Sequence, residues 1–367
     1  MQIALLKTNQ KVTRESCKLH ARVSRVAVVA ARLVRTLAGP GLKTVLSSLL
    51  LPLVACVANP NVAPKTGTLL GNYNVGANPE EVAIDARGHA WVTNWGSASV
   101  SQLSMSGELL GAYAVGYQPE GIAIDKVGDL WIANNGSGTL MKLSPAGVLL
   151  ETVAAGVKPH DIVLDKNGDL WVTDNGANTV MHFTSEGVLL AAFAVGLNPH
   201  GIAVDGAGNV WVVNNASNNV MKLSAAGMLL GTYAVGPDPI FIAIDQAQNV
   251  WVTNTMNNGR SFAPATVTEL SPNGQVLGSF PAGMNAWGIA IDAAGNLWVV
   301  NGLTNPEVLA PGTVTELSPG GTILGTYQAG TDALDIAIDG CGNVWVTNSG
   351  ASTVTQIAGA TACQGAL

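Results

Sequence analysis

Short apolar segments separated by turn residues recur along most of the chain, and the pattern repeats about every forty residues. In each copy an apolar segment ends in an Asp, and a Trp follows this Asp six residues later within a second apolar segment. The Asp occurs at Asp85, Asp125, Asp165, Asp205, Asp245, Asp292 and Asp339. Such a period, with one Trp per unit and no helical periodicity, is typical of β-propeller blades. We expect the Asp to cap its turn and the Trp to pack between blades.

Each repeat divides into four short strands, called A to D here. In the second repeat we expect them at residues 121–125, 130–134, 139–143 and 148–154, with Gly, Asp, Asn and Pro in the turns between them. The seventh repeat ends after its C strand, residues 352–358, whereas residues 67–76 resemble an isolated D strand. Pairing these two segments would close the ring without an open edge. We therefore predict an all-β, seven-bladed propeller over residues 67–367, closed by its N-terminal strand.

The first 55 residues differ in charge from the rest of the chain. They contain nine Lys or Arg and one acid, whereas the remainder has eight Lys or Arg and 23 acids, a net charge of −15 within a total of −7. A body this acidic repels nucleic acids and anionic lipids, so neither is an expected partner. The apolar run 45–55 has the length of a signal peptide and is too short to span a bilayer. Residues 1–55 are thus expected to be an export signal, whose unusually long basic part leaves open an over-extended start.

Two features involve cysteines. Residues 53–56 resemble a bacterial lipobox, so we expect Cys56 to be lipidated, residues 56–66 to form a tether, and the protein to be a cell-envelope lipoprotein that contacts the membrane only through this anchor. The alternative is a secreted or periplasmic protein cleaved near Ala58. Cys341 and Cys363 are expected to lie on one face and to form a disulfide after export; two free thiols are the alternative.

One position of the repeat varies in a way that indicates a site. Because strands A and B are antiparallel, the D–A and B–C loops share one face, called the top face. Just before each A strand the residues are Glu80, Glu120, His160, His200, Ile240, Trp287 and Leu334. Strand A is innermost, so these side chains should ring the mouth of the central channel, with polar groups facing an apolar arc. The B strands end on the same face, and we include Asn94, Asn134, Asp174 and Asn214 in the expected site.

The two longest B–C loops, residues 255–266 and 302–313, lie beside the apolar arc. They are expected either to form a partial lid or to be tolerated insertions.

The segments Pro-His-Asp-Ile at 159–162 and Pro-His-Gly-Ile at 199–202, together with the seven Trp segments, resemble NHL-repeat propellers and most closely the streptogramin (virginiamycin B) lyase-like family. The resemblance covers residues 67–358. It implies a top-face His as base, assisted by a Glu at the end of a B strand and a second His two residues later. His160 and His200 match the leading histidines. All seven B strands end in Asn or Asp, and no His follows two residues later, so the lyase set is incomplete.

Two functions remain open. The first, favoured by the incomplete lyase set, is a monomeric module that binds a small molecule or a protein on its top face. The second is an enzyme for elimination or for lactone or ester cleavage. In it, His160 or His200 is the base, Asp174 orients it, and Glu80 and Glu120 hold Mg²⁺ or Ca²⁺.

Overall fold

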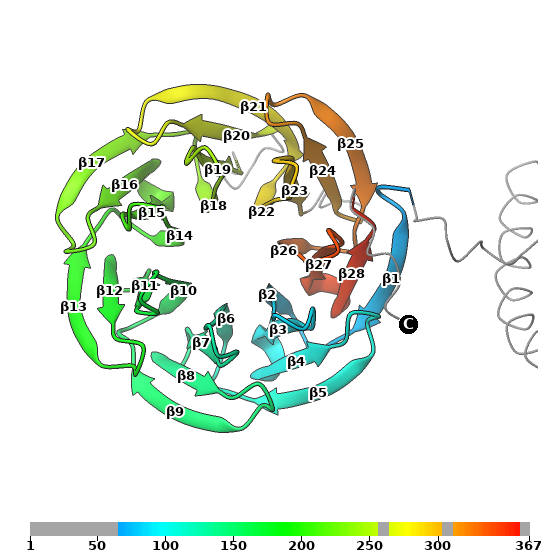
Figure 1. The fold of residues 1–367 in the computed structure, drawn as a ribbon, viewed down its shortest axis with the longest axis horizontal. Helices are drawn as coiled ribbons and strands as arrows, with labels where there is room; N and C mark the ends of the chain where they lie inside the picture. Colours follow the sequence, from blue (N-terminus) through cyan, green and yellow to red (C-terminus); the bar gives the residue numbers. More distant parts are fainter. Residues whose placement is uncertain (1–64, 256–263, 303–310, 360–367) are drawn as a thin grey trace, which may run out of the picture. The chain divides into compact units, whose positions relative to one another are not determined.

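The computed structural model describes residues 65–255, 264–302 and 311–359. These residues form seven four-stranded antiparallel sheets arranged around one axis, as Figure 1 shows. No helix in these three ranges is long and apolar enough to cross a membrane. The predicted export signal, Cys56, Cys363 and most of both long B–C loops lie outside the described residues.

Each sheet follows the order A, B, C, D from the axis outward. The A strands are β2 (Pro79–Ile84), β6 (Pro119–Ile124), β10 (Pro159–Leu164), β14 (Pro199–Val204), β18 (Pro239–Ile244), β22 (Ala286–Ile291) and β26 (Ala333–Ile338). The B strands are β3 (Ala90–Asn94), β7 (Leu130–Asn134), β11 (Leu170–Asp174), β15 (Val210–Asn214), β19 (Val250–Asn254), β23 (Leu297–Asn301) and β27 (Val344–Asn348).

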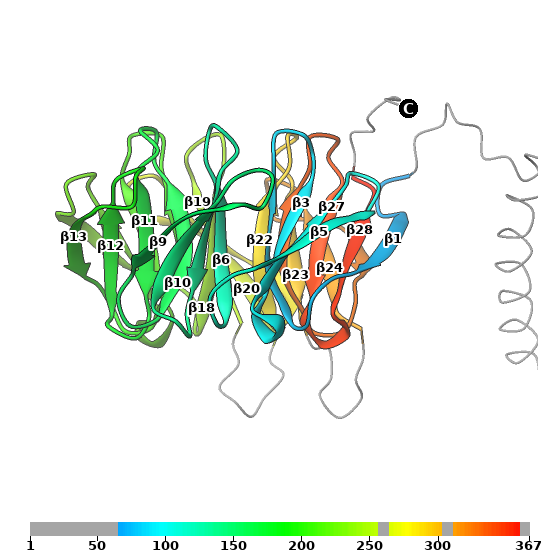
Figure 2. The ribbon, with the colours of Figure 1, turned by 90° about the horizontal axis from the view of Figure 1, so that it is seen from below.

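The outer half of each blade completes the sheet. The C strands are β4 (Ser99–Leu103), β8 (Thr139–Leu143), β12 (Thr179–Phe183), β16 (Asn219–Leu223), β20 (Pro264–Leu270), β24 (Thr313–Leu317) and β28 (Thr353–Ile357). The D strands are β5 (Leu109–Ala114), β9 (Leu149–Ala154), β13 (Leu189–Ala194), β17 (Leu229–Ala234), β21 (Val276–Met284), β25 (Ile323–Gln328) and β1 (Leu69–Asn74). Three B–C loops contain a 3₁₀ turn, η2 (Trp95–Ser97), η3 (Asn215–Ser217) and η4 (Ser349–Ala351). The top face is drawn downward in Figure 2.

The N-terminal strand closes the ring as predicted. Strand β1 pairs antiparallel with β28, from Leu69 opposite Ile357 to Asn74 opposite Thr353. In the second blade the B and C strands have the expected bounds, whereas the A strand begins two residues earlier and ends one residue earlier. Because β1 comes from the other end of the chain, the last blade is completed without leaving a sheet edge open at the junction.

The repeated Asp and Trp form one structural unit, as the sequence predicted. Asp292 accepts hydrogen bonds from the N–H groups of Ala294 and Asn296, each at 2.9 Å, and from the indole N–H of Trp298 at 3.1 Å. The first, fourth, fifth and seventh blades make the same indole bond. Each Trp is fully or almost fully buried and packs against the neighbouring blade. A carboxylate therefore fixes the turn and the orientation of the largest core side chain at once.

Within the described residues the second and third blades lack this indole bond, and a basic side chain contacts each Trp ring. In the second blade Lys142 lies 3.3 Å from Asp125 and is placed over the ring of Trp131. In the third blade the ring of His182 stacks on Trp171 with centroids 4.0 Å apart.

Cys341 lies in the turn between β26 and β27, where it is 5% exposed and donates its N–H to Asp339 at 2.9 Å. The bridge to Cys363 stays a prediction.

Replacing Asp292 with Ala should lower the free energy of unfolding by about 2–4 kcal/mol, because the buried indole N–H and two turn N–H groups lose a charged acceptor. Asp165→Ala is the matched control, since Asp165 accepts the same two turn N–H groups and, within the described residues, neither bonds an indole N–H nor pairs with a Lys, and it should cost less. Urea denaturation of both variants measures the difference. Equal losses would show that the indole bond contributes nothing to stability.

Candidate functional site

Every A strand contains a β-bulge at its second and third residues. In the first blade Glu80 and Glu81 together lie opposite the single residue Thr93. The register shifts at the same place in the other six blades. A bulge places two residues of one strand opposite one of its partner and changes where their side chains point. The innermost strand therefore brings two consecutive side chains, rather than alternate ones, to the mouth of the channel.

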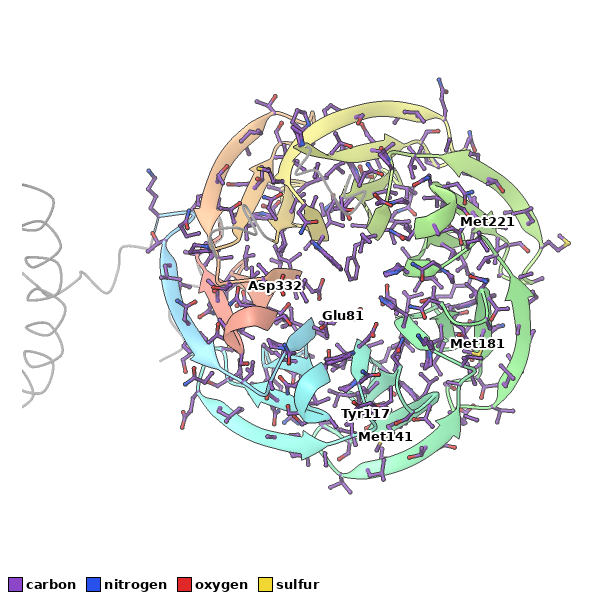
Figure 3. The ribbon with its side chains drawn as sticks, turned by 180° about the vertical axis from the view of Figure 1, so that it is seen from behind. Glu81, Tyr117, Met141, Met181, Met221 and Asp332 are labelled. Atoms are coloured by element: carbon purple, nitrogen blue, oxygen red, sulfur yellow. The ribbon has the colours of Figure 1, made fainter. Side chains whose placement is uncertain are left out.

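A pocket at the top of the channel combines charged and apolar side chains. Its empty volume is about 310 Å³, part of which is open to the solvent. Its lining residues are Glu80, Glu81, Glu120, His160, Phe241, Trp287, Leu334 and Asp335. Five of the seven positions expected to ring the channel line it, whereas His200 and Ile240 do not. Figure 3 shows Glu81 extending from β2 toward the axis.

The third position of the A strand alternates from blade to blade. Odd-numbered blades have large residues there and even-numbered blades have Gly; in order they are Glu81, Gly121, Asp161, Gly201, Phe241, Gly288 and Asp335. A Cβ atom added to Gly201 would lie 2.7 Å from the carbonyl oxygen of Ile240 and 2.9 Å from the Cα of Phe241. These glycines thus allow the next A strand to approach closely.

In the odd-numbered blades, a Thr on the B strand accepts a hydrogen bond from the backbone N–H of the bulge. The N–H of Glu81 donates to Thr93 Oγ1 at 3.0 Å, and the Thr93 hydroxyl donates to the carbonyl oxygen of Glu120 in the next blade at 2.7 Å. The N–H of Asp335 donates to Thr347 in the same way, at 2.9 Å. Asp161 and Phe241 have corresponding bonds. The bulge geometry is therefore specified by Thr on one strand and by the close approach of the neighbouring blade.

The three third-position acids link neighbouring blades. The carboxylates of Glu81, Asp161 and Asp335 accept the backbone N–H of the following A strand, at 3.1, 3.0 and 3.0 Å respectively. Burial raises the pKa of all three carboxyl groups, and their neighbours' negative charges add to the rise for Glu81 and Asp335. The N–H donors oppose this shift. The channel wall thus contains three buried carboxyl groups whose ionised form is disfavoured.

Among the acids that line the pocket, Glu80 is the one whose ionised form is least stabilised by contacts. In the part of the chain that the structure describes, its carboxylate makes no hydrogen bond or ion pair. Burial, followed by the charge of Glu120, raises the pKa of Glu80 to about 8, although His160 opposes the shift.

Two histidines meet beside these acids. His160 Nε2 lies 2.9 Å from Glu120 Oε2, and the rings of His160 and His200 are 4.3 Å apart. Burial lowers the pKa of His160, but the charge and hydrogen bond of Glu120 outweigh it and raise the pKa overall. Burial and the adjacent His160 hold the pKa of His200 well below its usual range. Asn198 Nδ2 lies 3.1 Å from His200 Nε2, which suits an acceptor nitrogen on a neutral ring. One histidine thus favours its charged form and the other its neutral form.

The residues that end the B strands do not line the pocket. Asn94, Asn134 and Asn214 are fully buried, and each side-chain amide donates to the C strand of its own blade. Asp174 is 1% exposed, and its carboxylate accepts four backbone N–H groups from the adjoining D–A and B–C loops. These contacts give Asp174 a structural role in fixing both loops, and none of them joins it to His160. The predicted catalytic and ligand contacts of the four residues stay predictions.

The fit of a metal ion can be judged from the donor atoms. Among the described residues, the group whose ligand atoms all lie within 4.8 Å of one another is Asp165, Asp169 and His182, at the opposite face. The pocket carboxylates form no such group of three. The pair Glu80 and Glu120 therefore lacks a converging third ligand for Mg²⁺ or Ca²⁺, ions that take six or more oxygen ligands.

With this geometry in view, comparisons with known proteins identify the family. Residues 114–365, more than half of the chain, match the model of the virginiamycin B lyase family. The chain belongs to the virginiamycin B lyase family. No curated protein matches this family member significantly.

Solved structures show the same fold at low identity. A streptogramin B lyase superposes with a TM-score of 0.67 at 18% identity, covering 78% of this chain and 96% of that one. The virginiamycin B lyase of Staphylococcus aureus gives 0.68 at 15% identity, covering 78% and 98%. Hydrazine synthase of Kuenenia stuttgartiensis gives 0.66 at 15%, covering 83% and 99%. At these identities the likeness establishes the propeller fold of this virginiamycin B lyase family member and nothing about its chemistry.

Sequence reasoning missed four of the pocket-lining or wall residues: Glu81, Asp161, Phe241 and Asp335. The ring expected from the sequence comprised a single position per repeat, and side chains of a regular strand alternate between its two faces, whereas the bulge brings the next residue to the channel as well. The alternation of Gly with large residues at this position, matched by Thr on the B strand, was the available signal.

The free energy of unfolding of this virginiamycin B lyase family member should fall as pH rises from about 4.5 to 8. Folding raises the pKa of Glu80 to about 8, so across this interval the folded state binds more protons than the unfolded state. Glu80→Gln removes this contribution and should stabilise the protein at pH ~8.5 by on the order of 2 kcal/mol, with little change at pH ~4.5. Denaturation at both pH values measures the effect, with the exposed Glu108→Gln as control. A variant less stable than wild type at the higher pH would contradict the prediction.

Proposed function

We propose that this protein binds a small molecule in the pocket at the top of its channel. The observation that carries the proposal is the convergence of four acids, His160, two aromatic rings and Leu334 on one pocket. Small-molecule sites usually combine apolar walls with a few placed polar groups in this way.

Unpartnered polar atoms support a bound ligand or water in this region. Glu81 Oε1, His160 Nδ1 and Trp287 Nε1 are buried and have no hydrogen-bond partner in the described structure. A buried polar atom without a partner costs free energy, and such atoms usually contact water or a ligand. Three of them at one pocket favour a molecule that offers both donors and acceptors. These atoms are buried, where a small molecule reaches them more readily than a protein surface does.

A variant that fills the pocket should lose ligand binding while keeping the fold. Leu334 lines the pocket and is 8% exposed, so Leu334→Trp should occupy the space that a ligand needs. Leu324→Trp, on the outer face of β25 where Leu324 is 53% exposed, is the matched control. A fragment library tested by saturation-transfer NMR should give binders to wild type and control that fail with the filled variant. Fragments that bind all three proteins alike would contradict the proposed site.

A second candidate is an enzyme that uses His160 in proton transfer. The specific observation is the pair of adjacent rings with opposite pKa shifts, one favouring the charged form and one the neutral form. Protonated His160 at the pocket can donate to a departing oxygen, while neutral His200 can accept a proton. A streptogramin B lyase and a catalytically inactive histidine-to-alanine variant of the S. aureus virginiamycin B lyase with quinupristin are among the similar structures. This similarity makes elimination or ester cleavage the reactions to test.

Product formation from cyclic depsipeptides and lactones, with and without EDTA, tests the enzyme. If His160 is the acid, activity should fall at high pH as it loses its proton. Glu120→Gln removes the group that raises the pKa of His160 and should move this fall to lower pH. His160→Gln should abolish turnover. Turnover that survives in His160→Gln, or an alkaline limb that Glu120→Gln leaves in place, would exclude this role.

The proposal includes export. It is supported by the basic and apolar character of residues 1–55 and by the lipobox-like residues 53–56, both inferred from sequence. We propose that the propeller acts outside the cytoplasm, anchored through Cys56 or released.

A further inference from the structure

Carboxyl groups outnumber basic groups in the pocket. Its lining includes four carboxyl groups, and His160 is the single lining residue that can carry a positive charge. That charge is already engaged, because His160 and Glu120 form an ion pair at 2.9 Å. Three carboxyl groups, those of Glu80, Glu81 and Asp335, remain without a cationic partner among the residues that line the pocket.

The hydrogen bonds of these three acids leave unused acceptors. Asp335 accepts the N–H of Val82, and one oxygen of Glu81 accepts the N–H of Ile122. The other oxygen of Glu81 has no partner although this residue is only 8% exposed, and Figure 3 shows that Glu81 points toward the axis. Within the described residues the carboxylate of Glu80 also has no hydrogen-bond partner. Buried carboxyl groups that lack donors favour a cationic ligand, because a nearby cation stabilises their ionised form.

The opposite wall is apolar and aromatic. It consists of Phe241, Trp287 and Leu334, contributed by the fifth, sixth and seventh blades. The faces of aromatic rings attract cations, most strongly when water is excluded. A bare metal ion does not suit this arrangement, because the lining carboxylates provide no three oxygens within 4.8 Å of one another. An ion with its own apolar surface matches both walls.

We propose that the pocket takes an organic cation, an ammonium group whose alkyl substituents pack against Trp287 and Phe241 while Glu80 and Glu81 balance its charge. This inference rests on the proposed function, that the pocket binds a small molecule, and adds the chemical class of that molecule.

Binding should release a proton. Four ionisable groups act on Glu80, namely Glu120, His160, Asp332 and Asp335. Burial and the net effect of these charges raise the pKa of Glu80 to about 8. Near neutral pH the empty pocket therefore holds Glu80 protonated, and a cation favours its ionised form. Affinity for the cation should rise with pH up to about 8 and then level off.

Choline and its neutral carbon analogue 3,3-dimethylbutan-1-ol are the probes, since they share shape and differ in charge. The indole N–H signal of Trp287 in ¹⁵N-Trp-labelled protein, assigned with Trp287→Phe, reports occupancy of the site. We expect choline to shift this signal and the alcohol to leave it in place at the same concentration. Glu80→Gln should weaken choline binding about tenfold, whereas Glu108→Gln should leave it unchanged. Choline binding should tighten from about pH 6.5 to 8.5.

Each of the other possible outcomes contradicts a specific part of the proposal. If the alcohol binds as tightly as choline, the pocket is a ligand site without charge selectivity, and the cation proposal fails while the proposed function stands. If neither probe moves the Trp287 signal, or if Glu80→Gln binds choline like wild type, the cation proposal also fails. The Leu334→Trp experiment then decides the proposed function independently. Thermal unfolding of Glu80→Gln verifies that the variant is folded, as expected for removal of a buried acid.

Discussion

The A strands of seven blades must pack around one axis, and the shortage of space there governs the inner wall of this protein. Where the blades approach most closely, a Cβ atom would meet the backbone of the next strand, and Gly121, Gly201 and Gly288 leave that space free. In the other blades a larger side chain occupies this position, and three of these side chains reach the neighbouring blade. Glu81, Asp161 and Asp335 do so with hydrogen bonds to its backbone. The inner wall is thus held by polar contacts between blades, while the Trp residues fill the core farther out.

This packing explains the electrostatics of the pocket. Acids that link blades must be buried, and burial disfavours their charged forms. Glu80 and Glu120 lie in the bulges of the first and second blades, and they add two more carboxyl groups to a region with little solvent. His160 is held in its charged form by Glu120, and that charge in turn favours a neutral His200. The ionisation states therefore follow from the geometry of the ring and from the order of residues around it.

Membership of the virginiamycin B lyase family and the propeller fold leave the chemistry undetermined, because a hydrazine synthase and a WD40 domain superpose about as well as a streptogramin B lyase. In this chain the ends of the B strands are occupied by Asn or Asp residues that fix loops, such as Asp174 with its four backbone N–H donors. The groups available for binding or proton transfer come instead from the A strands. This difference in position is the reason to treat binding of a small cation as a question separate from lyase activity.

The sequence by itself determined the architecture, because the forty-residue repeat with its Asp and Trp specifies one blade seven times. It also placed Glu80, Glu120, His160, Trp287 and Leu334 at one pocket, since an innermost strand leads each repeat. The tertiary structure alone decided that Glu81, Phe241 and Asp335 join them, because a bulge changes which side chains face the channel and depends on hydrogen bonds from neighbouring strands. It alone showed that Asn94, Asn134 and Asn214 are buried. Burial depends on how closely segments far apart in the chain pack against each other. The spacing of residues within one repeat does not determine that packing.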